Sequence, residues 1–481
     1  MALCSWKGSA SMPVADITLV NVSLPMPSEV ENKRDVYLPL GCLYLVSALE
    51  RAGYRVDFRD YQLFSLNHPN PLAIDAFVDF LADSAPIVGI SSMVSMLPFV
   101  LLGARRFREE HPDRALVLGG PGPSGVAKAI VEAMPWIDAV ARGEGEETIV
   151  ELVGALRDGG DLSSIKGLAY RKNGGRGVAR EGGAVCENPA RPRVKNLDAI
   201  GMPAYHAVDM SAYTSVSIVT GRGCPLNCAF CDVGPLWDNR VYLRGVDDVV
   251  KELYLLRRTY GRERVSLADD TFTLQRSRTE TLLKQMEGLD LAWSCLSRVD
   301  KLDEALLAKM ALAGCDAVFL GIESGSNDVL AKISKRFTIE EATQKVEMAT
   351  KHMKKIITSY IWGFPFETMD DFKSTIFSIV SMWHLGAMAG LKLLSPMPLS
   401  RLGIEYRDQI EFSEKLCSVF ASLGNITPEM SGKRAGIPEE FQVIIRQHPD
   451  IFEGFYYIKS DSIEAKAKYL EKFCEKFGIA V

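Results

Sequence analysis

The stretch Gly221-Arg-Gly-Cys-Pro-Leu-Asn-Cys-Ala-Phe-Cys231 places Cys224, Cys228 and Cys231 within eight residues, directly after an apolar run, Val216 to Val219. This spacing can present three thiolates on one face of a loop. A structural zinc site would need a fourth ligand, usually from a second C-x2-C or an H-x3-H motif, and the sequence contains neither. Three thiolates instead suit a cubane iron–sulfur cluster that keeps one iron open for a small molecule. The alternatives are a buried trio of reduced cysteines or a disulfide.

Length and composition indicate a globular protein with more than one domain. The chain has 481 residues, of which 47% are hydrophobic and 24% are charged, and this length predicts two or three domains. The net charge of -6 gives no reason to expect a nucleic-acid partner. Residues 1–14 do not have the pattern of a secretory signal and are expected to form a leader.

No segment is predicted to cross a membrane. Two long uncharged runs, Ser84 to Ala104 and Ser374 to Leu391, are interrupted by prolines or diluted by polar side chains, so neither is predicted as a bilayer span. A cytoplasmic protein is therefore expected, in which the ten cysteines are reduced thiols or metal ligands. Seven of them occur singly, which leaves the cluster as the distinctive group.

Residues 15–157 alternate short β-branched runs with helical patterns. Five strands separated by helices predict an α/β domain with a doubly wound, Rossmann-like parallel sheet. Such sheets bind ligands beyond the carboxyl ends of their strands, where Gly119, Gly120, Gly143 and Gly145 lie in this sequence. The alternative is that these glycines form tight turns without a ligand. The predicted strands are 17–21, 55–58, 87–91, 115–120 and 138–142.

The alternation returns in residues 211–400, after a linker (158–210) in which one small hairpin is expected. Six further β/α units predict a partial (β/α)6 barrel, whose chemistry is expected on the loops at the strand carboxyl ends. The cysteine loop is the first of these. Acidic residues after Thr368 predict the start of the fifth helix. The six predicted strands are 216–220, 265–268, 292–296, 317–322, 357–362 and 391–394.

The C-terminal region, residues 401–481, is expected to be mostly helical, with an amphipathic helix over 464–477. An aromatic group precedes this helix. We expect the region to cover the barrel, and the alternative is a contribution to the substrate pocket. The aromatic residues are Phe452, Phe455, Tyr456 and Tyr457.

The cysteine motif, at the end of the first strand of six β/α units, resembles that of the radical S-adenosylmethionine (SAM) superfamily, in which an aromatic residue precedes the last cysteine. The resemblance implies that Cys224, Cys228 and Cys231 hold a 4Fe-4S cluster whose open iron binds the amino and carboxylate groups of SAM. An electron from an external donor such as flavodoxin or ferredoxin would enter through the cluster and cleave SAM. The resulting 5′-deoxyadenosyl radical would abstract a hydrogen atom from the substrate.

Other loops resemble further elements of that superfamily. Asp269-Asp-Thr-Phe272 follows the second strand, and a helix-capping pair of carboxylates is its alternative role. Arg298 would bind the carboxylate of SAM, and a surface ion pair is its alternative role. In the resembling fourth-strand element Glu323 would hydrogen-bond SAM, and a buried glutamate without such a partner would be costly. The residues that the resemblance assigns to SAM are Phe230, Asp270, Arg298, Glu323, Gly363 and Pro365.

The N-terminal domain, placed directly before such a barrel, is similar to the cobalamin-binding domain of cobalamin-dependent radical SAM enzymes. The Asp-x-His-x-x-Gly motif that supplies a histidine to cobalt is absent. In this branch that absence implies base-off cobalamin without a histidine ligand, and the alternative is a domain that has lost its cofactor. The residues assigned to cobalamin are Ser91, Ser92, Gly119, Gly120, Gly143, Glu144, Gly145 and Glu146.

These resemblances predict a SAM- and cobalamin-dependent methyltransferase that acts on a carbon or phosphorus centre. No side chain is assigned as a catalytic residue, because hydrogen-atom abstraction removes proton and electron together. The alternatives are a cyclase or rearrangement enzyme of the same family, and a non-catalytic redox sensor. The helical tail and the lack of a peptide-recognition module favour a small-molecule or natural-product substrate.

Overall fold

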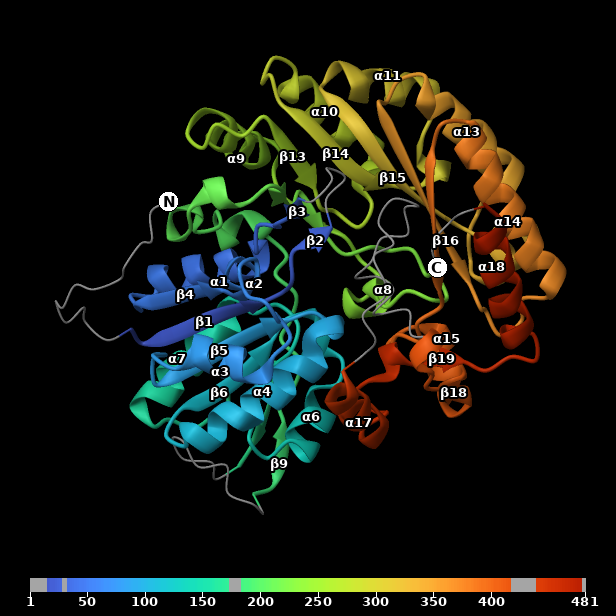
Figure 1. Ribbon diagram of the computed structural model, residues 1–481. Coiled ribbons are helices and arrows are strands. Elements are labelled where there is room, and N and C mark those ends of the chain that lie inside the picture. Colours follow the sequence, from blue (N-terminus) through green and yellow to red (C-terminus); the bar gives the residue numbers. More distant parts are fainter. Residues whose placement is uncertain (1–14, 28–32, 173–182, 417–437, 478–481) are drawn as a thin grey trace.

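The computed structural model describes residues 15–27, 33–172, 183–416 and 438–477. The predicted leader, residues 1–14, lies outside these ranges. Two sheets with their helices form the body of the molecule, and the strands of both point toward a common central region (Figure 1). Within the described ranges, no helix is long and apolar enough to cross a membrane.

The N-terminal sheet has seven strands in the order β4-β1-β5-β6-β7-β8-β9. The first five in this order are parallel, which confirms the predicted doubly wound sheet. Chain order reverses between β1 and β5, and ligands of such sheets bind beside this switch point. The strands are β1 (Ile17–Val22), β4 (Val56–Asp60), β5 (Ile87–Ser92), β6 (Ala115–Gly119), β7 (Ala139–Ala141), β8 (Leu168–Arg171) and β9 (Val185–Glu187).

Strands β8 and β9 come from the predicted linker, and they are more than an isolated hairpin. β8 pairs antiparallel with β7, and β9 pairs antiparallel with β8, so the hairpin extends the N-terminal sheet. The predicted turn between them, from Lys172 onward, lies largely outside the described residues.

Helices cover both faces of this sheet because alternate strand residues are apolar on each side. Ile17 and Ile87 share a core cluster with residues of α1 and α7, whereas Val20 and Val88 share one with residues of α3, α4 and α6. The helices are α1 (Leu40–Arg51), α3 (Ile74–Leu81), α4 (Leu97–Glu110), α6 (Ala127–Ala133) and α7 (Glu146–Asp158).

The second sheet contains the six predicted barrel strands in chain order, all parallel. This arrangement confirms the partial barrel. The strands are β10 (Ser217–Ile218), β13 (Arg264–Leu267), β14 (Ala292–Ser297), β15 (Cys315–Glu323), β16 (Lys355–Trp362) and β17 (Met388–Leu393). The first loop contains a short β-ladder of β11 (Gly221–Arg222) with β12 (Tyr242–Leu243) and a short helix, α8 (Val233–Leu236).

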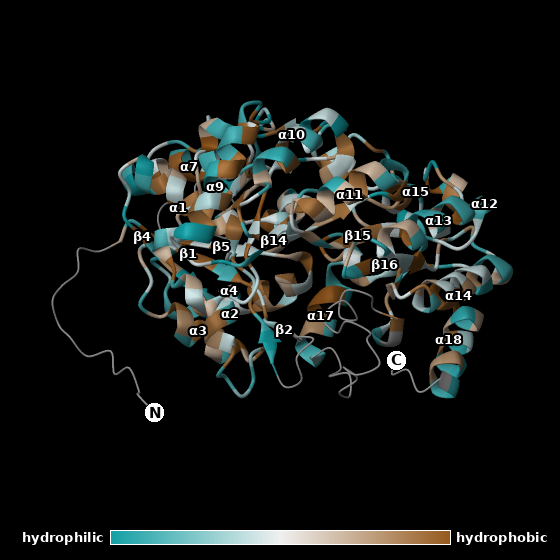
Figure 2. Ribbon diagram, turned by 90° about the horizontal axis from the view of Figure 1, so that it is seen from above, coloured by the Kyte–Doolittle hydropathy of each residue, from teal (hydrophilic) through white to brown (hydrophobic). Residues whose placement is uncertain are grey.

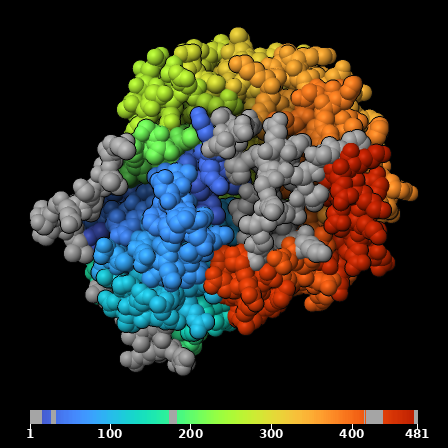
Figure 3. Space-filling model, in the orientation of Figure 1, coloured from blue at the N-terminus to red at the C-terminus, as the bar shows by residue number. Residues whose placement is uncertain are grey.

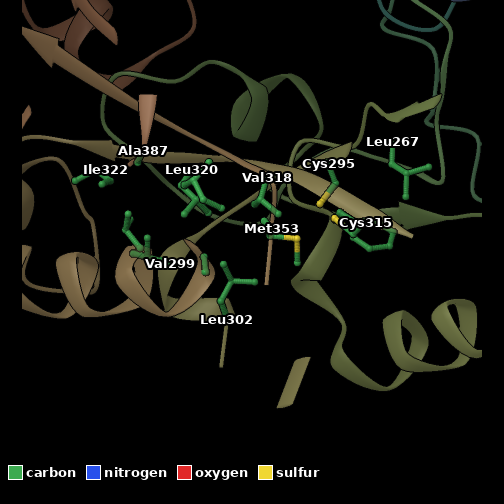
Figure 4. Packing of buried hydrophobic residues seen from close by; sticks show 14 of the residues in the cluster. Leu267, Cys295, Val299, Leu302, Cys315, Val318, Leu320, Ile322, Met353 and Ala387 are labelled. Carbon is green, nitrogen blue, oxygen red and sulfur yellow. The ribbon is translucent and has the colours of Figure 1, made fainter. Parts of the chain in front are cut away.

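Helices on the outer side of the barrel sheet bury one face of its strands. Figure 4 shows Val318 and Leu320 of β15 packed with Val299 and Leu302, within the largest hydrophobic cluster of the described residues. The predicted start of the fifth helix is confirmed, because Thr368 and Asp371 form a capping box. The helices are α9 (Val246–Arg258), α10 (Arg276–Met286), α11 (Glu304–Leu312), α13 (Ile339–Thr350) and α14 (Met369–His384).

The C-terminal region contacts both halves of the molecule. Helix α18 (Ile463–Phe477) lies beside α14 in both ribbon views (Figures 1 and 2). Helix α17 (Glu439–Gln447) packs instead on α4, and Figure 3 shows this part of the chain directly against the N-terminal domain. α15 (Arg401–Glu405) and a two-strand ladder, β18 (Ile410–Glu411) with β19 (Tyr457–Ile458), complete the region.

The expectation that the C-terminal region covers the barrel holds for α18, which packs on α14, but not for most of the aromatic group. Phe452, Phe455 and Tyr456 belong to the hydrophobic core of the N-terminal domain, and only Tyr457 belongs to the core of the barrel. An aromatic run specifies burial without specifying the partner, so the sequence could not reveal which half it joins.

Candidate active site

The three cysteines lie on the loop between β11 and α8, at the carboxyl edge of the barrel sheet. All three are free and half-buried. Sγ of Cys228 is 3.6 Å from Nη1 of Arg298, and Sγ of Cys224 is 3.9 Å from Oγ1 of Thr271. The described residues contain no group of three or more His, Cys, Asp or Glu side chains close enough to share a single metal ion.

Burial shapes the protonation of these thiols. It raises the pKa of Cys231 to about 12 and also raises the pKa of Cys224, although a hydrogen bond from a backbone amide opposes the shift in each case. The protein alone therefore holds these two thiols in the protonated form at neutral pH. A metal that binds them must displace the protons, since thiolate is the ligand form of cysteine.

The Asp269–Asp270 pair fastens the cysteine loop to the second strand. Oδ1 of Asp269 accepts hydrogen bonds from the backbone amides of Thr220 (2.6 Å) and Gly221 (3.1 Å). Oδ2 of Asp270 accepts one from the amide of Gly223 (3.2 Å), the residue before the first cysteine. The alternative of a helix cap was wrong, because both carboxylates bind loop amides. Contact of Asp270 with SAM stays a prediction.

Arg298 follows β14 and is buried beside the cysteine loop. Its Nε donates to Oδ1 of Asp300 at 2.8 Å, and its Nη1 approaches Cys228. Its Nη2 is buried and has no hydrogen-bond partner among the described residues. The ion pair expected as the alternative is present, with Asp300, but it is buried and does not lie at the surface. One nitrogen has no acceptor among the described residues.

Glu323 ends β15 with a positive φ of 78°, at a register shift between β15 and β16. Its buried carboxylate is not without a protein partner, because Oε1 lies 3.0 Å from Nζ of Lys335. Lys335 also donates to the carbonyl of Gly321 at 2.9 Å. Lys335 therefore supplies a protein partner for this carboxylate, and a hydrogen bond from Glu323 to SAM stays a prediction.

Lys335 also joins this carboxylate to the cysteine loop. Its Nζ lies 5.6 Å from the ring centroid of Phe230 and 5.9 Å from that of Phe337, within the range of cation–π attraction. The Phe230 ring in turn contacts Phe364 with centroids 6.2 Å apart. The sequence carries no signal for this role, because Lys335 resembles any lysine in a loop.

The fifth-strand turn carries Gly363 and Pro365, both predicted to shape the SAM site. Gly363 has φ +84°, and its amide donates to Oε2 of Glu367 at 2.9 Å. Glu367 forms a fully buried ion pair with Lys466 of α18 at 2.9 Å. The C-terminal helix therefore holds the turn in place. Pro365 is half-buried in the same turn.

The residues predicted for cobalamin line the carboxyl edge of the N-terminal sheet, and several glycines there have a local packing reason. Gly120 has φ +93°, and a Cβ on it would lie 2.8 Å from Oγ of Ser91 and 3.0 Å from the carbonyl oxygen of Ser92. A Cβ on Gly143 or Gly145 would collide with Arg193 or Leu45, respectively. Cobalamin contacts of these residues, and of Gly119, stay predictions.

Glu144 and Glu146 bind the barrel half of the protein. Oε1 of Glu144 lies 2.9 Å from Nη1 of Arg222, and Oε1 of Glu146 lies 2.6 Å from Nη2. The guanidinium also lies over the ring of Tyr44 at 5.2 Å, and Glu144 accepts from the amide of Val194. In this arrangement both carboxylates form an ion pair between the two halves, and contact of Glu144 and Glu146 with cobalamin stays a prediction.

Matches to two protein families divide the chain in the same way as the two sheets do. Residues 218–379 match the Radical SAM superfamily, and residues 32–153 match the B12 binding domain. An uncharacterized methyltransferase of Pyrococcus horikoshii is 34% identical over 375 residues, which cover 76% of this chain and 78% of that protein. The chain belongs to the cobalamin-dependent radical SAM family. Its cofactors are a 4Fe-4S cluster, SAM and cobalamin.

Other similar proteins have lower sequence identity to this chain. An anaerobic magnesium-protoporphyrin IX monomethyl ester cyclase of Rubrivivax gelatinosus is 28% identical and covers 82% of this chain and 69% of that protein. The structure of the methyltransferase TsrM from Kitasatospora setae, with tryptophan substrate and a SAM analogue bound, aligns with a TM-score of 0.67 at 19% identity over 95% of this chain and 88% of that chain. The structure of OxsB with aqua-cobalamin and SAM bound aligns with a TM-score of 0.63 at 17% identity, over 96% of this chain and 66% of that chain. These two structures show the shared fold.

The residues present fit the cofactors of a radical SAM enzyme. Three half-buried thiols share one loop, and Cys228 lies beside Arg298, whose Nη2 has no partner among the described residues and suits the carboxylate of SAM. On the cobalamin side, Met93 directly follows β5 and is 53% exposed, and Tyr37 is 47% exposed. A Cβ on Gly41, in the first turn of α1, would meet no atom within 4 Å. This edge therefore offers open space and apolar surface, which suit a broad, flat cofactor.

Proposed function

We propose that this chain is a SAM- and cobalamin-dependent methyltransferase that acts on a carbon or phosphorus centre of a small molecule or natural-product intermediate. The observation that carries the proposal is the ion pair of Arg222 with Glu144 and Glu146. Arg222 lies two residues before the first cysteine, and the glutamates follow β7 at the carboxyl edge of the other sheet. The ligand-binding edges of the two domains therefore face each other across a short distance.

Each half contributes a different function to this chemistry. The cluster and SAM supply a radical that abstracts hydrogen, and cobalamin supplies the methyl group. Arg298 and the Asp270-bound loop orient SAM, while Phe230 and Phe364 exclude water from the reaction site. An external one-electron donor such as flavodoxin or ferredoxin completes the system. No side chain is proposed as a general base.

The proposal is tested by analysing iron, cobalamin and SAM cleavage in protein prepared without oxygen. Wild-type protein is expected to hold a 4Fe-4S cluster and cobalamin, and to release 5′-deoxyadenosine from SAM in the presence of a reductant. Cys224→Ala is expected to abolish the cluster and the cleavage, while Cys186→Ala, at another half-buried free cysteine, preserves both. Survival of the cluster or of cleavage in Cys224→Ala would refute the assignment. Protein without 5′-deoxyadenosine formation would instead indicate a sensor.

A cyclase or rearrangement enzyme is the second candidate, and the relative from Rubrivivax gelatinosus, named as a cyclase, supports it. The two functions use the same cofactors and differ in the product. With SAM labelled in its methyl group, a methyltransferase gives a product that carries the label and is heavier by one methyl group. A product without label under turnover would exclude methyl transfer and favour the cyclase.

A further inference from the structure

The inner face of the barrel sheet carries a row of apolar side chains that remain open to solvent. The ladder registers place Leu296, Phe319, Ile357 and Met388 side by side across four neighbouring strands. Three of them, Leu296, Phe319 and Met388, are between 36% and 38% exposed. Large apolar residues in the middle of a sheet are normally covered, so this row leaves an uncovered apolar surface on the inner face of the sheet.

The next row toward the carboxyl edge consists of small residues. Gly321, Ser359 and Gly390 are neighbours in register on β15, β16 and β17. A Cβ on Gly390 would meet no atom within 4 Å, whereas the carboxylate of Glu323 already lies over Gly321. The free space above the apolar row is therefore on the β17 side of the sheet.

Lys392 lies at the rim of this space. Its register partner on β16 is Ile361. The next pair along the two strands is Trp362 with Leu393. Trp362 contacts Phe372 of α14, and Leu393 lies close to Gly363, so these two point to the helix side. Because strand residues alternate in direction, Ile361 and Lys392 point to the inner face. The burial pattern of β16 agrees, since its helix-side residues are buried and its inner-face residues are half-buried.

The charge of Lys392 is not neutralised by the described residues. Lys392 forms no hydrogen bond or ion pair with them, while the nearest acidic group, Glu323, is already paired with Lys335. Lys392 is exposed, as expected at the rim of an open space, while desolvation by the surrounding protein lowers its pKa and the charge of Glu323 partly opposes that shift. An anion that enters this space would restore a charged partner.

We infer that Lys392 binds the anionic group of the substrate, a carboxylate or a phosphoryl group, while the apolar part of the substrate fills the space over Gly390 against Phe319 and Met388. The substrate class is therefore an organic anion with an apolar body. The inference rests on the proposed function, because it places a substrate in the barrel of a radical SAM enzyme.

The test measures how fast an amine-reactive acylating reagent modifies Lys392 in the cluster-loaded full-length protein, read by peptide mass spectrometry. Four probes are compared: inorganic phosphate, phenyl phosphate, acetate and benzoate. At least one pair is expected to slow the labelling of Lys392 severalfold, with the aromatic member effective at a lower concentration. The exposed Lys373, which pairs with Asp370, is the internal control and keeps its rate. Protection by the phosphate pair or by the carboxylate pair identifies the anionic group.

A second variant tests the apolar part of the space over Gly390. Gly390→Val fills the free space with a residue that suits a strand, so the fold is expected to persist. In this variant the aromatic probes lose their advantage over the small anions. Equal advantage in both proteins, protection of Lys373 to the same degree, or no protection of Lys392 would overturn the inference. Protection by SAM alone would also overturn it, because Lys392 would then belong to the cofactor site.

Failure of the inference can be separated from failure of the proposed function. The labelling experiment needs no catalysis, whereas the proposed function is tested by the release of 5′-deoxyadenosine. Normal SAM cleavage, with no protection of Lys392 by any anion, would refute the inference and leave the proposed function intact. Anion protection without SAM cleavage would sink the proposed function, and with it the assignment of the bound anion as a radical substrate.

Discussion

Arg298 offers the most direct residue-scale test of cofactor binding, because its buried Nη2 has no partner among the described residues. Arg298→Met is expected to weaken SAM binding about tenfold or more, since hydrogen bonds to charged groups contribute about 1.5–3 kcal/mol. The measurement is equilibrium dialysis of SAM against cluster-loaded protein. Arg276→Met is the control, because Arg276 forms ion pairs at the surface. Unchanged affinity in Arg298→Met would show that this nitrogen does not meet SAM.

The Glu323–Lys335 pair predicts a stability effect at the same scale. Both side chains are buried, so Lys335→Met leaves the carboxylate of Glu323 without its partner. The expected loss in the free energy of unfolding is about 3–5 kcal/mol, typical of breaking a buried pair from one side. Glu323→Gln combined with Lys335→Met is expected to recover part of it, because no charge remains buried. Denaturant unfolding of the metal-free protein measures both variants, and an equal loss in single and double variants would contradict this explanation.

At the scale of elements, α18 is expected to control the fifth-strand turn through Lys466. Lys466→Met leaves Glu367 fully buried without its cation, although Glu367 still accepts from the amide of Gly363. We expect faster hydrogen exchange at the amide of Gly363 and along α18. Lys468→Met is the matched control, two positions along the same helix. Unchanged exchange at Gly363 in Lys466→Met would show that α18 does not hold the turn.

The regular elements of both domains could be predicted from the sequence because their signals are local. Each of the six barrel strands lies within a few residues of its predicted range, since alternation of apolar runs and helical patterns encodes the β/α unit. The three cysteines of the loop stand out for the same reason. The pairing of β8 with β7 could not be predicted, because strand partners are set by contacts distant in sequence.

The ion-pair partners of the candidate site residues could not be predicted from the sequence either. Arg222, Lys335 and Lys466 carry no local pattern. Arg222 and Lys466 pair with carboxylates far away in sequence, and the partner of Lys335, Glu323, belongs to another element. Glu144 was expected to contact cobalamin because it lies at the right sheet edge. That edge also forms the contact between domains, and position along a strand does not distinguish the two roles.

At the scale of the whole molecule, we expect a pH-dependent contact between the N-terminal domain and the segment before the barrel. The contact is the hydrogen bond from Tyr213 to the buried carboxylate of Asp60. Burial raises the pKa of Asp60 above 3.8, although hydrogen bonds from Asn21, Gln62 and Tyr213 oppose the shift. The native state therefore keeps this proton to a higher pH than the unfolded state does. The contribution of Asp60 to the free energy of unfolding is expected to decrease as pH rises from 3.8 through the raised pKa. Asp60→Asn should lose this contribution, measured as the difference from wild type in urea titrations, whereas the exposed Asp79→Asn should retain it.

The ion pair at Arg222 carries the last prediction, which concerns how the two halves are held together. Arg222→Met leaves Glu144 and Glu146 unpaired at a contact where their side chains are nearly buried, so it should weaken that contact by about 3–5 kcal/mol. The radius of gyration from X-ray scattering and hydrogen exchange at Val194 should both increase, while cluster content and 5′-deoxyadenosine formation persist, because the three cysteines are untouched.

Arg191→Met is the matched control for that variant. Arg191 also binds two glutamates, Glu147 and Glu151, but both belong to α7 and not to the barrel half. Its removal should leave the radius of gyration unchanged. Arg222→Lys should fall between wild type and Arg222→Met, since lysine keeps the charge but lacks the two guanidinium nitrogens that contact separate glutamates. An increase in Arg191→Met, or none in Arg222→Met, would show that the halves are joined mainly by the apolar contacts of α17 and not by this ion pair.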